Sequence, residues 1–392
     1  MILAWLGLAR AAPWDDVSWY VIPNAAVDTD DGFGAGGRAE VAFLKEGHDP
    51  YWLSLVAQGY AATSGFQHHR FRLDRVGMGP RHRTRLTLHL AWRQWLNDGY
   101  FGIGNGTTRD AAFVGSFEAD DPRRREYRYQ LFQPFAHLTV RQQIGDSPWE
   151  VYGALQPKWS WITAYEGSLL EEDQPFGMAG GPVIQVLGGV MHDTRQPEIA
   201  PQRGHLAEVG GRVAPSLGGE AGGFGGPILS VRGFAPVGGR IVLAGRWMAE
   251  WLFGTVPFYE MVHWGGAIPV QGFGGFESLR GIQLGRWRAP GKTLVNLEAR
   301  TCIASLSVLK GHPLDLELAP YVDAGTVWGA SDPVTTGFPV HPAIGLGARA
   351  IFDETFVGRI DNGFGLDPVE QADGTVDDVW TWGFYLTFDH AF

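Results

Sequence analysis

Cysteine is almost absent from this sequence, since Cys302 is the one cysteine among 392 residues. An internal disulfide and a C-x-x-C metal or redox motif are therefore excluded. Charge is also sparse: 19% of residues are charged, and 42 acids against 31 lysines and arginines give a net charge of -11. Binding to nucleic acid requires clustered lysine and arginine against the phosphates, so we expect no nucleic-acid partner.

Long apolar runs are missing as well, and no stretch reaches the about 18 consecutive apolar residues of a transmembrane helix. A short apolar run, ILAWLGLA, covers residues 2–9, and Ala9-Arg10-Ala11 then matches an A-x-A cleavage site. We interpret residues 1–11 as a signal peptide, the alternative being an ordinary apolar N-terminal segment. Whether the peptide begins upstream of Met1 stays open, because the basic residues that normally precede such a run are missing.

Glycine and aromatic residues, in contrast, are abundant. The chain has 56 glycines and 16 tryptophans, and 13% of its residues are aromatic. Glycine at about twice its usual share favours many tight turns. Tryptophan and tyrosine gather at both surfaces of a membrane, so we expect the tryptophans to form an interfacial girdle rather than a ligand cage.

Apolar and polar residues alternate along much of the chain. The period of two recurs in residues 83–93, 240–251 and 296–300; in the last of these, Leu297 and Ala299 fall on one face and Glu298 on the other. Strict alternation predicts a sheet with one apolar face. A soluble sandwich with its apolar face inward would also produce this pattern.

Three features favour a membrane barrel over a sandwich. The alternating segments run for about 12–16 residues, where strands of soluble proteins usually have about 5–6. Their polar faces are rich in arginine and glutamate, which suits a hydrated lumen with lipid on the other side. We predict an all-β fold: a 16-stranded antiparallel transmembrane β-barrel over residues 32–392, with residues 12–31 as a short periplasmic N-terminal segment. The first, eleventh and last predicted strands are 32–46, 256–267 and 378–392.

The third feature is the end of the chain, where alternation continues to a terminal phenylalanine. Phe384, Leu386, Phe388 and Phe392 are expected to face lipid. An aromatic end on an amphipathic strand resembles the signal that the outer-membrane assembly machinery reads. We assign that signal to Gly383, Leu386, Phe388 and Phe392.

The most specific stretch covers residues 274–300 and reads GGFESLRGIQLGRWRAPGKTLVNLEAR. It is followed by YVDAGTVW at residues 321–328. Together these segments resemble the BamA/TamA-type outer-membrane barrels, the bacterial surface antigen superfamily. Residues 28–37 (DTDDGFGAGG), 100–105 (YFGIGN) and 359–361 (RID) resemble other parts of the same barrels, so the resemblance extends over nearly the whole chain after residue 20.

The resemblance implies that the extracellular loop between strands eleven and twelve folds inward into the lumen. Its tip is Arg280 with Gly281, and the partners of the arginine are Glu298 and Asp323. A guanidinium has five fixed donors and can bind two carboxylates, which lysine does less well. We expect this set to be a structural lumen lock, compatible with gating, rather than a catalytic site. Ile282 departs from the aromatic residue usually found after Arg-Gly.

The resemblance also has gaps. We expect no counterpart of the POTRA domains that assembly and secretion members carry. We also expect no lipase domain like that of patatin-type relatives, since no G-x-S-x-G occurs in the sequence. Adjacent His68 and His69 point to opposite faces of a strand and cannot bind one metal ion together, so we predict no metal site. We also predict no cofactor and no catalytic residue.

The function implied is that of a stand-alone, non-enzymatic barrel in the outer membrane of a Gram-negative bacterium. Surrounded by the lipid bilayer, it would help to move or insert protein or lipid through its lumen or its first-to-last strand seam, with a separate periplasmic or lipoprotein partner. The alternatives are a small-solute channel or transporter, an outer-membrane lipid-modifying enzyme with an unidentified Ser/His pair, and a structural anchor.

Overall fold

The computed structural model describes residues 14–28, 32–107, 121–217, 222–268, 270, 272–308, 312–329, 339–352, 356–367, 369–370, 376–377, 381–388 and 390–392. The predicted signal peptide, residues 1–11, lies outside the described residues. Within the described part of the chain, no helix is long and apolar enough to cross a membrane.

Almost all regular structure is β-strand. The strands are β1 (Asp16–Asp28), β2 (Gly32–Leu44), β3 (Leu53–Ala62), β4 (Gln67–Met78), β5 (Thr84–Gly99), β6 (Arg128–Gln143), β7 (Trp149–Ala164), β8 (Gly181–Asp193), β9 (Gly204–Ala214), β10 (Phe224–Val237), β11 (Ile241–Trp251), β12 (Phe253–Gly254), β13 (Gly291–Val308), β14 (His312–Trp328), β15 (His341–Phe352), β16 (Phe356–Gly365), β17 (Val369–Glu370), β18 (Val376–Asp377) and β19 (Thr381–Phe388). Two short helices, the 3-10 turn η1 (Pro122–Arg125) and α2 (Leu169–Asp173), lie in connections.

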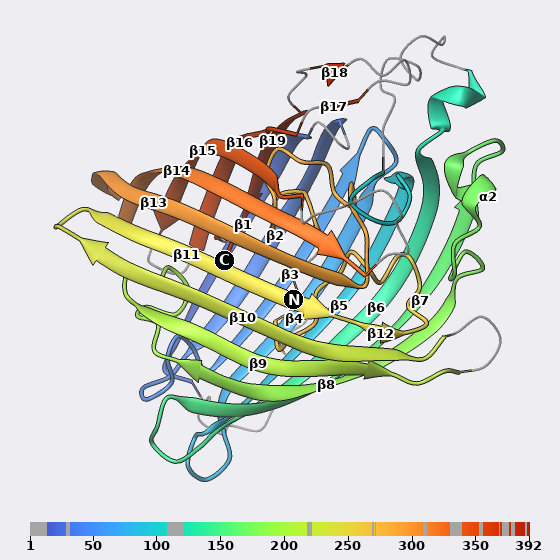
Figure 1. The fold of residues 1–392 in the computed structure, drawn as a ribbon. Helices are drawn as coiled ribbons and strands as arrows, with labels where there is room; N and C mark the ends of the chain where they lie inside the picture. Colours follow the sequence, from blue (N-terminus) through green and yellow to red (C-terminus); the bar gives the residue numbers. More distant parts are fainter. Residues whose placement is uncertain are drawn as a thin grey trace, which may run out of the picture.

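One antiparallel sheet contains every strand except β17 and β18, which form a separate hairpin. Neighbouring strands follow the order of the chain, from β1 to β16 and then to β19. β11 and β12 both pair with β10, and β11 pairs with β13 on its other side. The sheet curls around an interior, so that the first and last strands lie next to each other (Figure 1). No backbone ladder joins β1 to β19 within the residues that are described.

The predicted alternation is confirmed in the burial of the strands. In β13, Val295 and Leu297 are exposed while Asn296 and Glu298 are buried. In β11, Trp247 and Trp251 are exposed while Arg246 and Glu250 are buried. The exposed face is therefore apolar and the interior is charged, the reverse of a soluble protein and the arrangement expected where lipid surrounds a barrel.

The strand count of the described residues agrees with the prediction, but one predicted strand was wrong and one strand of the sheet was missed. The sheet has 17 strands, of which β11 and β12 are successive parts of one, which leaves sixteen. Residues 16–28, expected within a short periplasmic segment, form β1 and pair with β2 along their whole length. Here Val17, Trp19 and Val21 carry the period-two signal on the exposed face.

Residues 256–267, predicted as the eleventh strand, are instead part of a long connection between β12 and β13. We call the described residues of this connection, 255–268, 270 and 272–290, the interior segment, because they run within the curl of the sheet (Figure 1). Phe258 and Trp264 are both buried, so this stretch has no exposed face, and its apolar residues pack inside the barrel instead of facing lipid. Alternation between a polar and an apolar environment is absent, which is why no strand forms there.

The two ends of the sheet differ in the length of their connections. One end has short turns, such as residues 79–83 between β4 and β5, 144–148 between β6 and β7, and 238–240 between β10 and β11. The other end has longer connections, among them the one between β5 and β6 and the one that contains the interior segment. β1 begins at the short-turn end, since Asp16 pairs with Leu44 at the end of β2.

Candidate functional site

Arg280, at the tip of the interior segment, is completely buried against the inner face of β13 and β14. Its Nε donates to Asp323 Oδ2 at 2.8 Å and its Nη2 to Asp323 Oδ1 at 2.9 Å. Its Nη1 lies 2.5 Å from Glu298 Oε1. The structure thus brings together the three charged residues identified from the sequence, with a bidentate guanidinium–carboxylate pair on one side and a second carboxylate on the other.

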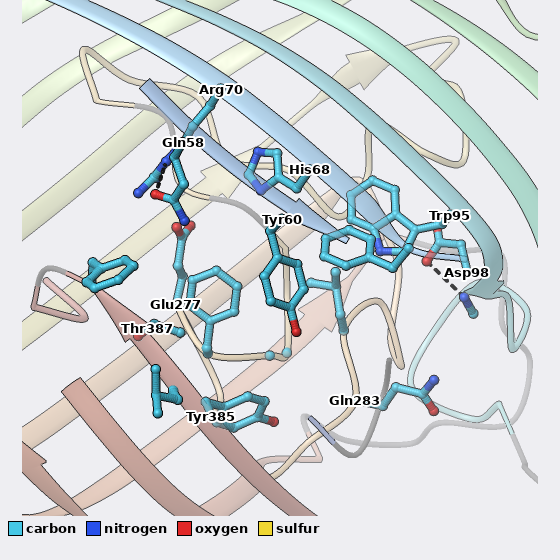
Figure 2. Close-up of a pocket in the computed structure, with 18 of the residues that line it drawn as sticks. Gln58, Tyr60, His68, Arg70, Trp95, Asp98, Glu277, Gln283, Tyr385 and Thr387 are labelled. Carbon is cyan, nitrogen blue, oxygen red and sulfur yellow. Dashed lines mark hydrogen bonds between the residues drawn. The ribbon is translucent and has the colours of Figure 1, made fainter. Parts of the chain in front are cut away.

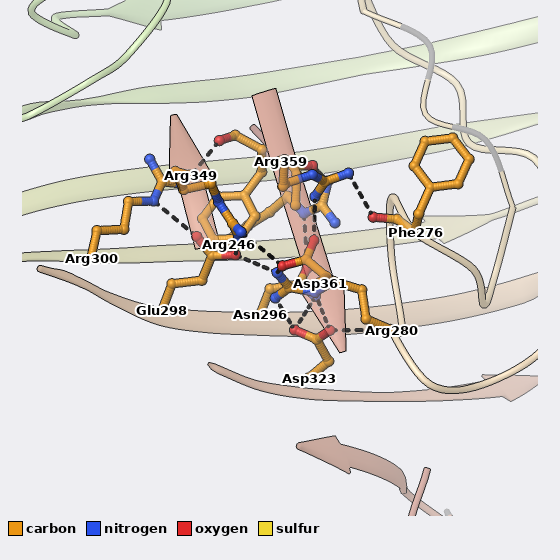
Figure 3. Close-up of polar contacts among 12 residues, drawn as sticks. Arg246, Phe276, Arg280, Asn296, Glu298, Arg300, Asp323, Arg349, Arg359 and Asp361 are labelled. Atoms are coloured by element: carbon orange, nitrogen blue, oxygen red, sulfur yellow. Dashed lines mark hydrogen bonds and ion pairs between the residues drawn. The ribbon is translucent and has the colours of Figure 1, made fainter. Parts of the chain in front are cut away.

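A third acid and three further arginines extend this site, and we call the whole set the Arg280 cluster (Figure 3). Asp361 of β16 lies 3.6 Å from Arg280 Nη1. Arg349 bridges two of the acids, lying 3.3 Å from Glu298 and 2.8 Å from Asp361. Arg300 binds Glu298 at 2.9 Å, and Arg359 binds Asp361 at 3.2 Å. The acids come from β13, β14 and β16 and the additional arginines from β13, β15 and β16, so the cluster joins one loop to four strands.

The backbone of the tip is fixed as tightly as the side chain. Arg280 N donates to Asp323 Oδ2, Gly281 N donates to the Tyr385 hydroxyl at 3.3 Å, and Thr381 Oγ1 donates to Gly281 O at 2.7 Å. Gly281 has a φ of +97°, and a Cβ placed there would lie 2.5 Å from the carbonyl carbon of Gly363. A glycine is therefore required both by the backbone conformation and by the close approach to β16.

An aromatic ring covers the guanidinium of Arg280. The Arg280 Cζ lies 3.5 Å from the centre of the Tyr321 ring. Glycine makes room for that ring, because a Cβ at Gly345 would lie 2.3 Å from the Tyr321 hydroxyl. Ile282, which stands where an aromatic residue was expected from the resemblance, is buried in an apolar cluster with Phe273 and Leu279.

A second buried group of charges, which we call the Glu260 cluster, holds the other half of the interior segment. Glu260 lies 2.8 Å from Lys158 of β7, and its second oxygen lies 3.4 Å from Arg212 of β9. Arg212 also binds Glu250 of β11 at 2.8 Å, and Lys292 of β13 binds the same carboxylate at 2.5 Å. All five side chains are nearly or completely buried.

Between the interior segment and the first strands lies a cavity of about 170 Å³. Aromatic side chains surround it, among them Tyr60, Trp95 and Tyr385, and Glu277 of the interior segment lies at its side (Figure 2). His68 also lines this cavity, whereas His69 is exposed on the outer face. The two histidines point to opposite faces, which confirms that prediction.

The seam between β1 and β19 is bridged by side chains near its short-turn end. The Tyr20 ring of β1 lies 5.1 Å from the Phe356 ring, and Phe356 lies 5.5 Å from Phe388 at the end of β19. Arg38 of β2 lies 5.7 Å from the Phe388 ring. On the outer face of β1, Trp19 and Val21 are 70% and 66% exposed.

The residues assigned to the C-terminal assembly signal occupy different places. Leu386 pairs with the exposed Ile360 on the outer face, and Phe388 ends β19. Gly383 is on the inner face, where a side chain would collide with Tyr385.

The expectation that Phe392 faces lipid was wrong. It is buried in the interior with Phe234 and Val242, 5.1 Å from Arg246 and 5.3 Å from Arg300. Regular strand ends at Phe388, so alternation no longer determines the direction of the residues that follow.

Several site residues were missed by the sequence analysis. Arg349, Arg359 and Asp361 alternate with exposed Leu346 and Ile360 on β15 and β16, so the same parity that indicated Glu298 could have indicated them. Glu260 could not be found in this way, because the interior segment has no alternation. The described residues hold no group of three or more His, Cys, Asp or Glu side chains able to bind a metal ion.

These observations define a class: the fold is that of an outer-membrane β-barrel of the BamA type. Solved structures with this fold include BamA from Haemophilus ducreyi lacking POTRA domains 1–3, with a TM-score of 0.54 at 13% identity. CdiB from Acinetobacter baumannii has a TM-score of 0.53 at 15% identity, and CdiB from Escherichia coli 0.57 at 13%.

The three alignments cover 94–95% of this chain, but 70% of the BamA chain and 60% and 62% of the CdiB chains. The chain therefore spans less than two thirds of either CdiB. No model of a protein family matches the sequence. No curated protein matches it either.

Proposed function

We propose that this chain is a non-enzymatic barrel of a Gram-negative outer membrane that moves or inserts protein or lipid at the seam between β1 and β19. The observation that carries the proposal is the seam itself. Every other neighbouring pair in the sheet is joined by a backbone ladder, whereas β1 and β19 lie side by side without one in the described residues. Unpaired strand edges are templates for an incoming strand.

The exposure of β1 supports the same proposal. Trp19 and Val21 are more exposed than any other large apolar residue of the described chain, as expected on an edge strand with a neighbour on one side only. The side-chain contacts that bridge the seam include the rings of Tyr20, Phe356 and Phe388, and no backbone ladder supports them in the described residues. The seam is therefore the weakest join in the wall of the barrel.

The lumen is a poorer route. The interior segment lies within it and is attached by two buried clusters of charge, so a small-solute channel is the less favoured alternative. A separate periplasmic or lipoprotein partner would capture the client protein or lipid.

The test is site-specific photocrosslinking in native outer membranes. A photoreactive amino acid replaces Trp19 or Val21 at the seam, and Val209 of β9 serves as the control, because it is 62% exposed on the same outer face but far from the seam. We expect protein adducts from the seam positions and none from position 209. Equal adducts at all positions, or adducts at none of them, would contradict a role for the seam.

A further inference from the structure

The connection between β8 and β9, residues 194–203, is unlike the other turns at the short-turn end. It is longer than the neighbouring turns at residues 144–148 and 238–240. Its base is closed by an isolated bridge between Gln196 and Arg203. Its tip, Ala200 with Pro201, is buried, although a turn at the end of a sheet is normally exposed to solvent.

The tip is buried because it crosses to strands that are distant in the sheet. Ala200 packs with Ile351 of β15 and Val357 of β16 in one apolar cluster. Ile351 and Val357 are direct partners in the ladder near the short-turn end of their hairpin. Four strands lie between β9 and β15 in the sheet, namely β10, β11 with its continuation β12, β13 and β14. The contact therefore reaches across the opening of the barrel and not along its wall.

A second attachment fixes the turn on another side. Glu198 binds Arg85 of β5 at 2.6 Å, and Arg85 in turn binds the buried Asp74 of β4. Burial alone would raise the pKa of the Glu198 carboxyl, but the guanidinium groups of Arg85 and Arg195 lower it below its ordinary value. The carboxylate is therefore charged at neutral pH and the ion pair is maintained.

The turn also has a fixed shape of its own. Arg195 binds Asp193 through two hydrogen bonds, at 3.0 and 2.7 Å, and its Nη1 donates to Glu198 O at 3.4 Å. On the side of β2 to β5, a charged open hollow of about 960 Å³ is lined by this turn together with the neighbouring turns. The turn thus forms one wall of a vestibule at the short-turn end.

We propose that residues 194–203 form a floor that closes the lumen at its short-turn end, a second closure independent of the one held by Arg280. The two closures share no residue: the floor is held by Arg85, Ile351 and Val357, and the tip of the interior segment by Glu298, Asp323 and Asp361. Passage through the lumen then requires both to move. This proposal is independent of the function proposed for the seam between β1 and β19.

The position of the floor is tested by crosslinking in the full chain, purified into lipid vesicles, with Cys302→Ser removing the natural thiol. Ala200→Cys and Val357→Cys are joined by a short bismaleimide, and Gln196→Cys with Val357→Cys is the control, since Gln196 lies at the base of the turn. We expect the 200–357 pair to react severalfold faster than the control, with or without Arg280→Ala. Equal rates would overturn the floor, and loss of the crosslink in Arg280→Ala would overturn its independence.

Its role as a closure is tested by conductance in planar bilayers. Ala200→Asp places a carboxylate against Ile351 and Val357 and should release the tip, because a charge among apolar side chains is strongly unfavourable. We expect the double variant with Arg280→Ala to conduct severalfold more than Arg280→Ala alone. Equal conductance of the double variant and of Arg280→Ala would overturn the proposal that the floor is a second closure. This result is independent of the photocrosslinking at the seam.

Discussion

At the scale of single residues, Arg280 is the point where the buried charges of the interior segment and of the strand wall meet. It faces three acids, from β13, β14 and β16, which hold it by charge-assisted hydrogen bonds in a region closed to solvent. Removing one partner of a buried ion pair typically costs about 3–5 kcal/mol, because the remaining charge is left without compensation. The stability of the chain should therefore depend strongly on this side chain.

We expect Arg280→Ala to lower the free energy of unfolding by about 3–5 kcal/mol, and Arg280→Lys by less, because a single ammonium keeps the charge but cannot bind two carboxylates with the same fork. The measurement is urea unfolding of the purified barrel in lipid vesicles. Arg83→Ala is the control, since its partner Asp146 is 94% exposed and an exposed pair contributes only about 0–1 kcal/mol. Equal effects of Arg280→Ala and Arg83→Ala would contradict the structural importance of the Arg280 cluster.

Gly281 gives a second prediction at this scale. With φ at +97° and Gly363 against it, Gly281→Ala should displace the tip and cost about 1–3 kcal/mol. Gly153→Ala is the matched control, because nothing lies within 4 Å of a Cβ built at that position. If both substitutions leave the unfolding midpoint unchanged, the close contact between the tip and β16 does not exist.

At the scale of elements, the interior segment is attached at two separate places. The Glu260 cluster fixes residues near 260 to β7 and β9, and the Arg280 cluster fixes residues near 280 to β13, β14 and β16. The two attachments lie on different parts of the wall. Each half of the segment should therefore respond to the loss of its own cluster.

Hydrogen exchange measures this directly. Glu260→Gln should speed the exchange of amides in residues 256–267 and leave residues 274–284 protected, whereas Arg280→Lys should have the opposite effect, because local opening follows the loss of local contacts. If either variant loosens both halves to the same extent, the segment is a single cooperative unit and the account of two attachments is wrong.

The elements also show how far the sequence alone could lead. Alternation predicted the strands and the inward direction of Glu298, because a sheet between lipid and a polar interior imposes a period of two on every residue. The same rule failed at residues 256–267, where both sides of the chain meet protein, and at Phe392, which lies after the last strand has ended. The contacts of Glu260 depend on tertiary packing between segments far apart in the sequence, so they could not be predicted from a local sequence pattern.

At the scale of the whole molecule, the strands of the barrel and the segment inside it have different proposed roles. In the part of the chain that the structure describes, backbone pairing joins all neighbouring strands except β1 and β19. The interior is occupied by a segment anchored through buried ion pairs. We propose that exchange with client protein or lipid takes place at the seam, while the lumen stays closed. A closed lumen also keeps small solutes from leaking across the membrane through a barrel of this width.

The most direct measurement of this central claim is the electrical conductance of the intact chain in a planar lipid bilayer, beside that of Arg280→Ala. We predict that the intact chain stays closed apart from brief openings, and that Arg280→Ala opens more often, because the tip of the interior segment is no longer held and only the floor of residues 194–203 still has to move. A steady, large conductance from the intact chain, unchanged by Arg280→Ala, would contradict the account and return the small-solute channel as the better explanation.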